Sequence, residues 1–307
     1  MTLTELRYVV TLARERHFGR AAEKCFVSQP TLSIAIRKLE DELGVTLFER
    51  TAGEVHLTSV GEQVVAQSQR VLDEAAAIKE IARQGKDPLS GTLRLGVIFT
   101  VGPYLLPQLI PRLRKIAPQM PLVIQENYTA RLAELLKQGE LDAVIVAQPF
   151  GEAGIEVRAL YDEPFMVAVP KGHAWEARKF IRGEELGDES LLMLGAGHCF
   201  RDQVLQSFPA LNRTTDAAGS MTRTMEGSSL ETLRMMVASG AGVTVMPSTA
   251  AAAHTSKNSL VKYLPFAKPV PDRRIVLAWR SSFARAAAVD ALSKAVHACD
   301  LPGAKSI

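Results

Sequence analysis

The sequence predicts a chain of two parts, in which a small helical domain is joined by one long helix to a larger α/β domain. Two short helical patterns with a tight break between them lie within residues 18–50. A stretch without Pro or Gly then runs from Glu62 to Gln84 and predicts the long helix. After residues 84–91, where Gly, Pro and Ser gather, strand-like and helical runs alternate, as is typical of an α/β domain.

The paired helical patterns predict a helix-turn-helix. Ser28 can cap the second helix, and Pro30 suits its first turn. Apolar residues recur on one face and predict a buried stripe of Leu32, Ile36, Leu39 and Leu43. The other face offers a hydroxyl, an apolar side chain and a guanidinium at Ser33, Ile34 and Arg37, with the amide of Gln29 at the helix start. Such groups can pair with base edges of DNA, although a plain helical hairpin with solvated charges fits the same pattern.

Three segments of the N-terminal part, SQPTLS, IRKLEDELGVTLFER and LTSVGE, resemble the winged helix-turn-helix of LysR-type transcriptional regulators. The resemblance covers residues 1–90 and implies binding to double-stranded DNA. The residues that match the major-groove face are Gln29, Pro30, Thr31, Ser33 and Arg37, and Arg50 leads into the wing. The wing departs from the family pattern, because residues 51–54 bring one acid and no basic side chain.

The same resemblance divides the chain into three parts. Residues 1–58 are expected to form the DNA-binding domain, residues 59–90 the linker and dimerisation helix with its hinge, and residues 91–301 a regulatory domain. The regulatory domain is expected to resemble periplasmic binding proteins, with two α/β subdomains.

The strand-like runs of this larger part predict mostly parallel sheets. They cover residues 93–99, 122–128, 141–147, 165–169, 191–194, 243–246 and 275–279. Ligands of such sheets bind at the carboxyl ends of strands, where this sequence places Thr100 and Thr129. Each threonine also stands just before a predicted helix and suits a simple helix cap.

The long helix carries Val64, Val71 and Ile78 at intervals of seven, with Ala75 and Ala82 between them. This spacing predicts a short heptad seam that pairs with a second copy of the chain. Packing of the helix on its own domain is the alternative. The LysR-type resemblance implies a homodimer that assembles into a homotetramer, with RNA polymerase as a further partner.

Composition and charge limit the kinds of function. The net charge is only +3, and the first sixty residues hold eight Lys or Arg against eight Asp or Glu, so DNA contact would depend on single residues. The three cysteines match no zinc spacing and no P-loop, HExxH or GxGxxG motif occurs, so we expect no metal and no cofactor. With neither a secretory signal nor an apolar run of membrane-spanning length, a cytoplasmic protein is expected.

Cys199 differs from Cys25 and Cys299 in its surroundings. It lies directly before a predicted helix and beside His198 and Arg201, and a helix start with positive neighbours favours the reactive thiolate. Without such surroundings, a lone cysteine is more often a small buried hydrophobe.

The segment GHCFRDQ, residues 197–203, resembles the redox loop of the peroxide-sensing branch of LysR-type regulators. The segments TVGPYLLPQLIP, LLMLGAGHC and SSLETLRMMVASGAGVTVMP extend this resemblance, which spans residues 3–298. It implies that Cys199 is the peroxide-reactive thiol and would form a sulfenic acid. The peroxide pocket that it implies is made of Thr100, Thr129, His198, Arg201 and Asp202.

One departure from that branch concerns the second cysteine. Its members usually carry a resolving cysteine nine residues after the first, and this chain has Phe208 there. The protein could signal through a sulfenic acid or mixed disulfide, stall before disulfide formation, or have lost peroxide sensing. The sequence leaves these three open.

Three functions therefore follow from the sequence. The first is a DNA-binding transcriptional regulator that senses hydrogen peroxide through Cys199 and controls oxidative-stress genes. The second is a regulator of the same architecture that binds a small organic effector between two subdomains, with Cys199 inert. The third, a thiol peroxidase-like enzyme, would need a recycling thiol, and none lies close in sequence, so we expect a regulator and no enzyme.

Overall fold

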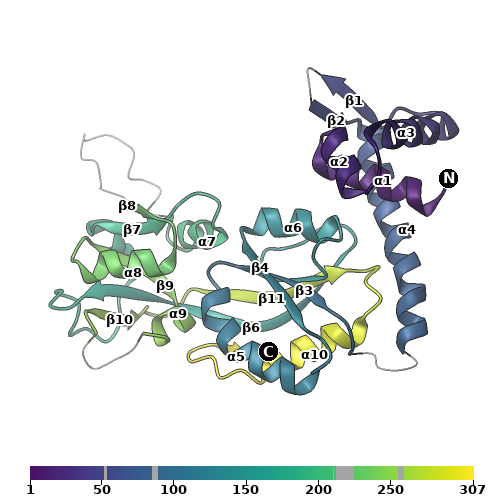
Figure 1. The fold of residues 1–307 in the computed structure, drawn as a ribbon. Coiled ribbons are helices and arrows are strands. Elements are labelled where there is room, and N and C mark those ends of the chain that lie inside the picture. The colour runs from purple at the N-terminus through teal and green to yellow at the C-terminus, as the bar shows by residue number, and fades with distance from the viewer. Residues whose placement is uncertain (52–53, 85–88, 210, 212–224, 255–258) are drawn as a thin grey trace.

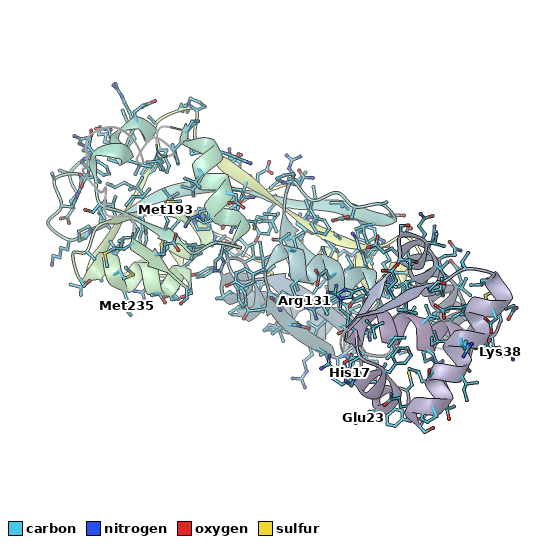
Figure 2. The ribbon with its side chains drawn as sticks, turned by 90° about the horizontal axis from the view of Figure 1, so that it is seen from above. His17, Glu23, Lys38, Arg131, Met193 and Met235 are labelled. Atoms are coloured by element: carbon cyan, nitrogen blue, oxygen red, sulfur yellow. The ribbon has the colours of Figure 1, made fainter. Side chains whose placement is uncertain are left out.

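The computed structural model describes residues 1–51, 54–84, 89–209, 211, 225–254 and 259–307. A helical N-terminal domain sits at one end, the long helix α4 runs beneath it, and the larger α/β domain extends away from both (Figure 1). Seen from above, His17 and Lys38 mark the N-terminal domain, Arg131 lies in the middle, and Met193 and Met235 mark the far end (Figure 2).

The N-terminal domain is built from three short helices and a hairpin. These elements are α1 (Leu3–Glu15), α2 (Phe18–Lys24), α3 (Gln29–Leu43), β1 (Phe48–Thr51) and β2 (Glu54–Leu57), with β1 and β2 antiparallel. Ser28 caps α3 as predicted, since its Oγ accepts from the amide of Thr31. The small side chains of Ala21 and Ala22 are buried and let α2 approach its neighbours. Leu32, Ile36 and Leu39 are buried as predicted, whereas Leu43 is 39% exposed, so its predicted burial was wrong.

Helix α4 (Ser59–Gln84) follows the hairpin, and Thr58 Oγ1 accepts from the amide of Gly61 at its start. Val64 and Val71 are half-buried against the apolar core of the N-terminal domain, which includes α1. The expectation that this stripe has nothing of its own chain to pack against was therefore wrong for these two residues. Ile78, further along, is 70% exposed.

The α/β domain comprises seventeen elements within the described residues, and every predicted strand-like run contains or overlaps a strand. They are β3 (Leu93–Ile98), α5 (Gly102–Ile116), β4 (Leu122–Asn127), α6 (Thr129–Lys137), β5 (Ala143–Ala147), β6 (Ile155–Pro170), η1 (Gly183–Asp188), β7 (Leu191–Leu194), α7 (Cys199–Ser207), β8 (Met225–Gly227), α8 (Leu230–Ala238), β9 (Val243–Pro247), α9 (Ser248–Ala252), β10 (Val261–Pro265), β11 (Asp272–Arg280), α10 (Ala286–His297) and β12 (Lys305–Ser306).

The strand order is β4-β3-β5-β11-β6-β9-β7-β8, and β10 and β12 also pair with β6. The expectation of mostly parallel sheets was wrong. Parallel pairing is found at the two ends, among β4, β3 and β5 and among β9, β7 and β8, whereas β6 and β11 run antiparallel to all their neighbours. The long strand β6 crosses between the two halves, because Leu160 and Tyr161 lie in one apolar core and Phe165 and Val167 lie in the other.

The apolar interior of this domain consists of two cores. One contains β3, β5, α5, α6 and α10, and the other contains β7, β9, η1 and α8. We call the two halves subdomain I and subdomain II. Cys199 packs against the core of subdomain I, whereas Phe200, the next residue, is buried in the core of subdomain II. The start of α7 therefore lies at the junction of the two subdomains. Among the described residues, none of the helices has the length and apolar character needed to cross a bilayer.

Candidate functional site

Cys199 is the first residue of α7 and opens onto a small pocket at the junction of the subdomains. The pocket is lined by Ile98, Phe99, Thr100, Asn127, Tyr128, Thr129, Gly197, His198 and Cys199. Its volume of about 10 Å³ is close to what one water molecule needs. A pocket of this size suits a ligand of one or two heavy atoms.

The topology of subdomain I explains why the two threonines meet here. Strands β3 and β4 pair in parallel with Ile98 opposite Asn127, so both strands end at the same edge of the sheet. Thr100 and Thr129 follow these strand ends and line the pocket together. Thr129 begins α6, but its Oγ1 is buried without a hydrogen-bond partner among the described residues. A buried hydroxyl of this kind requires a partner, and a molecule in the pocket can supply one.

Thr100 is held by an arginine that the sequence analysis missed. Arg273 Nη1 donates to Thr100 Oγ1 at 2.8 Å, and its Nε donates to Glu163 at 2.8 Å. Because a guanidinium only donates, the hydroxyl hydrogen of Thr100 is left free to donate elsewhere. Arg273 also lies over the ring of Phe200, 4.9 Å from its centroid. The only signal in the sequence was a charged residue next to the apolar run of β11.

His198 is only 5% exposed and lies edge-on to two aromatic rings that the sequence analysis also missed. The ring centroids of Tyr128 and Phe99 are 4.8 and 5.9 Å from that of the imidazole. Burial lowers the pKa of His198, and a backbone hydrogen bond with Ser228 opposes this only in part. The imidazole is therefore neutral near pH 7, and the expected positive charge beside Cys199 is wrong for His198.

Arg201 and Asp202 lie outside the pocket lining, contrary to the expectation. Arg201 donates to the carbonyl of Leu194 at 2.9 Å and pairs with Glu226. Residues two apart on a helix are turned by about 200° around its axis, so Arg201 and Cys199 point to nearly opposite sides of α7. Asp202 is exposed in the first turn of the same helix. Three positive groups were expected to favour the Cys199 thiolate: His198, Arg201 and the amino end of α7. Of these three, only the partial positive charge at the amino end of α7 is found beside Cys199.

Gly197 supplies the backbone conformation that leads the chain into α7. Its φ is +94°, in the left-handed region that favours glycine, and a Cβ there would lie 3.4 Å from the ring of Tyr128. His198 then serves as the N-cap residue in extended conformation.

Phe208, at the position of the usual resolving cysteine, lies at the opposite end of α7 from Cys199. Its side chain is 8% exposed and packs on the ring of Phe266, with centroids 4.8 Å apart. It also fills the space above Gly183, where a Cβ would lie 2.5 Å from the ring. Phe208 is thus a core residue of subdomain II.

The buried imidazole predicts a pH dependence of stability. His198 binds a proton less readily in the folded chain than in the unfolded chain, whose pKa is close to the ordinary 6.5. This residue therefore leaves stability unchanged well above pH 6.5 and lowers it as pH falls from there towards the depressed folded pKa. Urea unfolding from pH 8 to pH 5 should show a steeper loss for the unmodified chain than for His198→Gln. Parallel curves would contradict the neutral buried imidazole.

The second candidate site is the outer face of α3. Gln29, Pro30, Thr31 and Arg37 are exposed there, and Ser33 is half-buried. Ile34 on the same face is 68% exposed, a high value for an apolar side chain. Arg50 belongs to β1, but its side chain lies outside the described residues.

The remaining cysteines lie away from this pocket. Cys25 is the C-cap residue that follows α2, and Cys299 follows α10, where burial raises the pKa of its thiol. The structure as described contains no group of three His, Cys, Asp or Glu side chains that could hold a metal ion.

Comparison with known proteins places both sites in one family. Residues 3–62 match the model of the bacterial regulatory helix-turn-helix protein of the lysR family, and residues 86–299 match that of the LysR substrate binding domain. The chain is 43% identical over 299 residues to the DNA-binding transcriptional dual regulator OxyR of Escherichia coli K12, covering 97% of this chain and 95% of that protein. The chain belongs to the OxyR branch of the LysR family.

Solved structures of this branch of the LysR family support the same assignment. Full-length OxyR from Pseudomonas aeruginosa, with an aspartate in place of a cysteine, is 52% identical, with a TM-score of 0.81 over 98% of this chain and 99% of that one. A cysteine mutant of Corynebacterium glutamicum OxyR with hydrogen peroxide bound is 32% identical, with a TM-score of 0.62 over 96% of this chain and 91% of that one. The winged helix-turn-helix and the two-subdomain regulatory domain are therefore those of the LysR family.

Proposed function

We propose that this LysR-family regulator senses hydrogen peroxide by oxidation of Cys199 and responds by changing how it binds DNA. The observation that carries the proposal is the pocket at the start of α7. It joins a cysteine at a helix N-terminus to two threonine hydroxyls, one of which has no hydrogen-bond partner in the described part of the chain, in a space of about 10 Å³. That size favours hydrogen peroxide over an organic effector. The peroxide-bound structure of the Corynebacterium relative supports the same choice.

The residues of the pocket can perform the reaction with atoms and electrons in balance. The neutral His198 imidazole takes the thiol proton, and the Cys199 thiolate attacks one oxygen of the peroxide. The O–O bond breaks, and the departing hydroxide takes from His198 the proton that came from the thiol and becomes water. Sulfur is oxidised to the sulfenic acid and the peroxide is reduced. Thr100, with its hydrogen directed away from Arg273, and Thr129 hold the two peroxide oxygens in line.

The sensing step is tested by competition among the three thiols. The protein is treated with less than one equivalent of hydrogen peroxide, and a sulfenic-acid trap is added. Mass spectrometry should find the label on Cys199 first, with Cys25 and Cys299 nearly unlabelled. Faster labelling of Cys25 or Cys299 would contradict the proposal.

The response requires operator DNA to be bound through the exposed face of α3. Arg37 is exposed there and a guanidinium can donate two hydrogen bonds to guanine. Arg37→Ala should weaken operator binding by about 1–3 kcal/mol and relax the preference at one base pair. Binding measurements on an operator and on variants of each base pair test this. Arg20→Ala, on α2 of the same domain, is the matched control, and equal affinity and specificity for both variants would refute the α3 assignment.

Assembly and output complete the proposal. Residues 1–58 bind DNA, residues 59–90 link and dimerise, and residues 91–301 sense peroxide. Exposed Ile78 on α4 supports pairing with a second copy, while Val64 and Val71 are shared with the domain's own core. Dimers assemble into a homotetramer that acts on oxidative-stress genes through RNA polymerase in the cytoplasm.

A further inference from the structure

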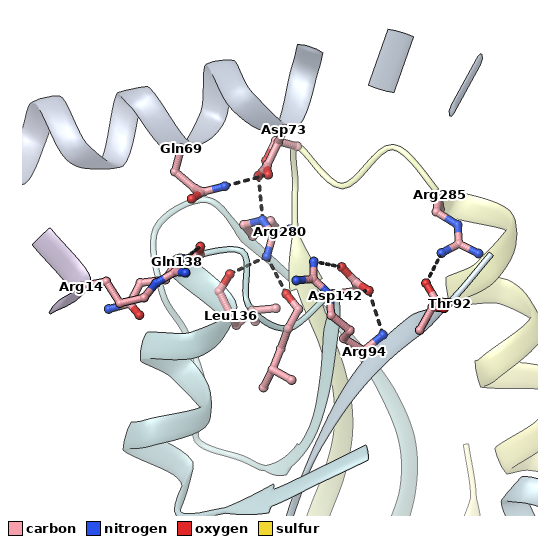
Figure 3. Close-up of polar contacts among 12 residues, drawn as sticks. Arg14, Gln69, Asp73, Thr92, Arg94, Leu136, Gln138, Asp142, Arg280 and Arg285 are labelled. Carbon is pink, nitrogen blue, oxygen red and sulfur yellow. Dashed lines mark hydrogen bonds and ion pairs between the residues drawn. The ribbon is translucent and has the colours of Figure 1, made fainter. Parts of the chain in front are cut away.

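A buried ion pair joins the linker helix α4 to subdomain I. Asp73 of α4 and Arg280 at the end of β11 approach to 2.7 Å between Oδ2 and Nε, and their side chains are only 13% and 8% exposed (Figure 3). Ser282 donates to the same oxygen at 2.8 Å. Gln69, one turn earlier on α4, donates to Oδ1 at 2.9 Å. The carboxylate of Asp73 is therefore fully engaged, with two of its three donors from the regulatory domain.

Arg280 also holds the carboxyl end of α6. Its Nη1 donates to the carbonyl of Leu136, in the last turn of that helix, and to the carbonyl of Leu141 at 2.7 Å (Figure 3). A cation at this end of a helix satisfies free carbonyls and complements the helix dipole. One guanidinium thus fixes α4 and the end of α6 together.

The other end of α6 is the peroxide pocket. The helix begins with Thr129, and Leu136 lies seven residues later, so about 11 Å along the helix separates the pocket from the α6 carbonyl that Arg280 holds. Leu132, Leu135 and Leu136 of α6 are buried in the core of subdomain I. Helix α6 is therefore a continuous packed connection between Thr129 and the carbonyl that Arg280 holds.

A second contact reaches the loop that follows α6. Arg14 of α1 donates to the carbonyl of Gln138 at 2.8 Å and pairs with Glu140 at 2.7 Å. Gly139 between them has φ of +70°, and a Cβ there would lie 2.6 Å from Nε2 of Gln69. The N-terminal domain and α4 therefore both meet the carboxyl end of α6 and its loop. We call this set, Arg14, Gln69, Asp73, Arg280 and residues 138–140, the linker contact.

We infer that the linker contact couples the oxidation state of Cys199 to the position of the DNA-binding domain through α6. This inference rests on the proposed function and names how the peroxide pocket is linked to DNA binding. A displaced α6 would shift the guanidinium of Arg280 that its Leu136 carbonyl binds, and separating Arg280 from Asp73 would leave a largely buried carboxylate without its charge partner, which is costly. Coupling between two sites is reciprocal at equilibrium, so operator DNA must also change the equilibrium between reduced Cys199 and its mixed disulfide with a small thiol.

Asp73→Asn tests the inference, because it keeps the shape of the side chain and removes its charge. Operator affinity is measured for reduced protein and for protein with Cys199 oxidised, and the ratio of the two is the coupling. The ratio should move at least about fivefold closer to one in the variant. In a buffer of fixed small-thiol and disulfide concentrations, operator DNA should shift the equilibrium fraction of Cys199 held as the mixed disulfide in the unmodified chain and leave it unchanged in Asp73→Asn. The oxidation rate without DNA should be similar in both.

Asp162→Asn is the matched control, because it breaks the ion pair of Asp162 with Arg274 in the same subdomain, away from α4. It should keep the full coupling. If thermal unfolding shows that Asp73→Asn is not folded, Arg14→Gln is used instead. It removes the other half of the linker contact and should lower the coupling in the same way. Full coupling in whichever of these two variants folds would overturn this inference and leave the proposed function standing. Absence of coupling in the unmodified chain would overturn the proposed function and this inference with it.

Discussion

Replacing Cys199 by Ser should abolish the response of this protein to hydrogen peroxide. Its fold, and the operator binding that the reduced protein shows, should be unchanged. A serine hydroxyl at the start of α7 is nearly the size of a thiol, but it is not ionised at neutral pH. It therefore cannot attack the peroxide. Footprinting of the operator with and without peroxide measures the response. We expect identical footprints for the variant and different ones for the unmodified chain.

Cys299→Ser is the matched control for that experiment. Cys299 is half-buried, its Sγ donates to the carbonyl of Ala295, and burial raises its pKa, which disfavours the thiolate. This variant should keep the full peroxide response. Loss of the response here, together with its survival in Cys199→Ser, would move the sensor to Cys299.

The second large effect is expected for Phe208→Cys, which supplies the cysteine that this chain lacks. Removing a buried ring from the core of subdomain II should lower the free energy of unfolding by about 3 kcal/mol. The two sulfurs would start at opposite ends of α7, about 13 Å apart along the helix. A disulfide needs Cα atoms within about 7 Å, so it forms only if α7 unwinds.

Peroxide should therefore give two different products in the two chains. The unmodified protein should hold Cys199 as a sulfenic acid, or as a mixed disulfide with a small thiol. It should over-oxidise more readily than a chain with a resolving cysteine. Phe208→Cys should convert that sulfenic acid into an intramolecular disulfide with loss of helical signal. Phe208→Leu is the control, since it keeps an apolar side chain and adds no thiol. A Phe208→Cys chain whose sulfenic acid persists with α7 intact would contradict this prediction.

Much of the architecture was predictable because its signals are local. Ser28, Pro30 and the leucine stripe specify α3, and the two strand ends at Thr100 and Thr129 follow from short apolar runs. Leu43 was misjudged because a periodic pattern continues into the last turn of a helix whether or not another element covers it. The antiparallel direction of β6 and β11 is set by strand pairing across the whole domain, which a linear pattern does not contain.

The site was predictable in part for the same reason. Cys199, His198 and the threonines follow from motif and resemblance, but the charge state of His198 depends on rings contributed by Phe99 and Tyr128 from other segments. Arg273 and Glu163 escaped because charged side chains are expected at the surface, and here they are buried as a pair. Arg201 was expected in the pocket from the family resemblance, whereas here it pairs with Glu226 and is absent from the pocket lining.

The central claim is that oxidation of Cys199 alone changes how the protein binds DNA. Peroxide is titrated into the protein on operator DNA, and each sample is divided between footprinting and mass spectrometry of Cys199. The account predicts that the altered footprint rises in proportion to the fraction of Cys199 oxidised, from the first substoichiometric addition. Complete oxidation of Cys199 with an unchanged footprint, or an altered footprint while Cys199 stays reduced, would contradict it.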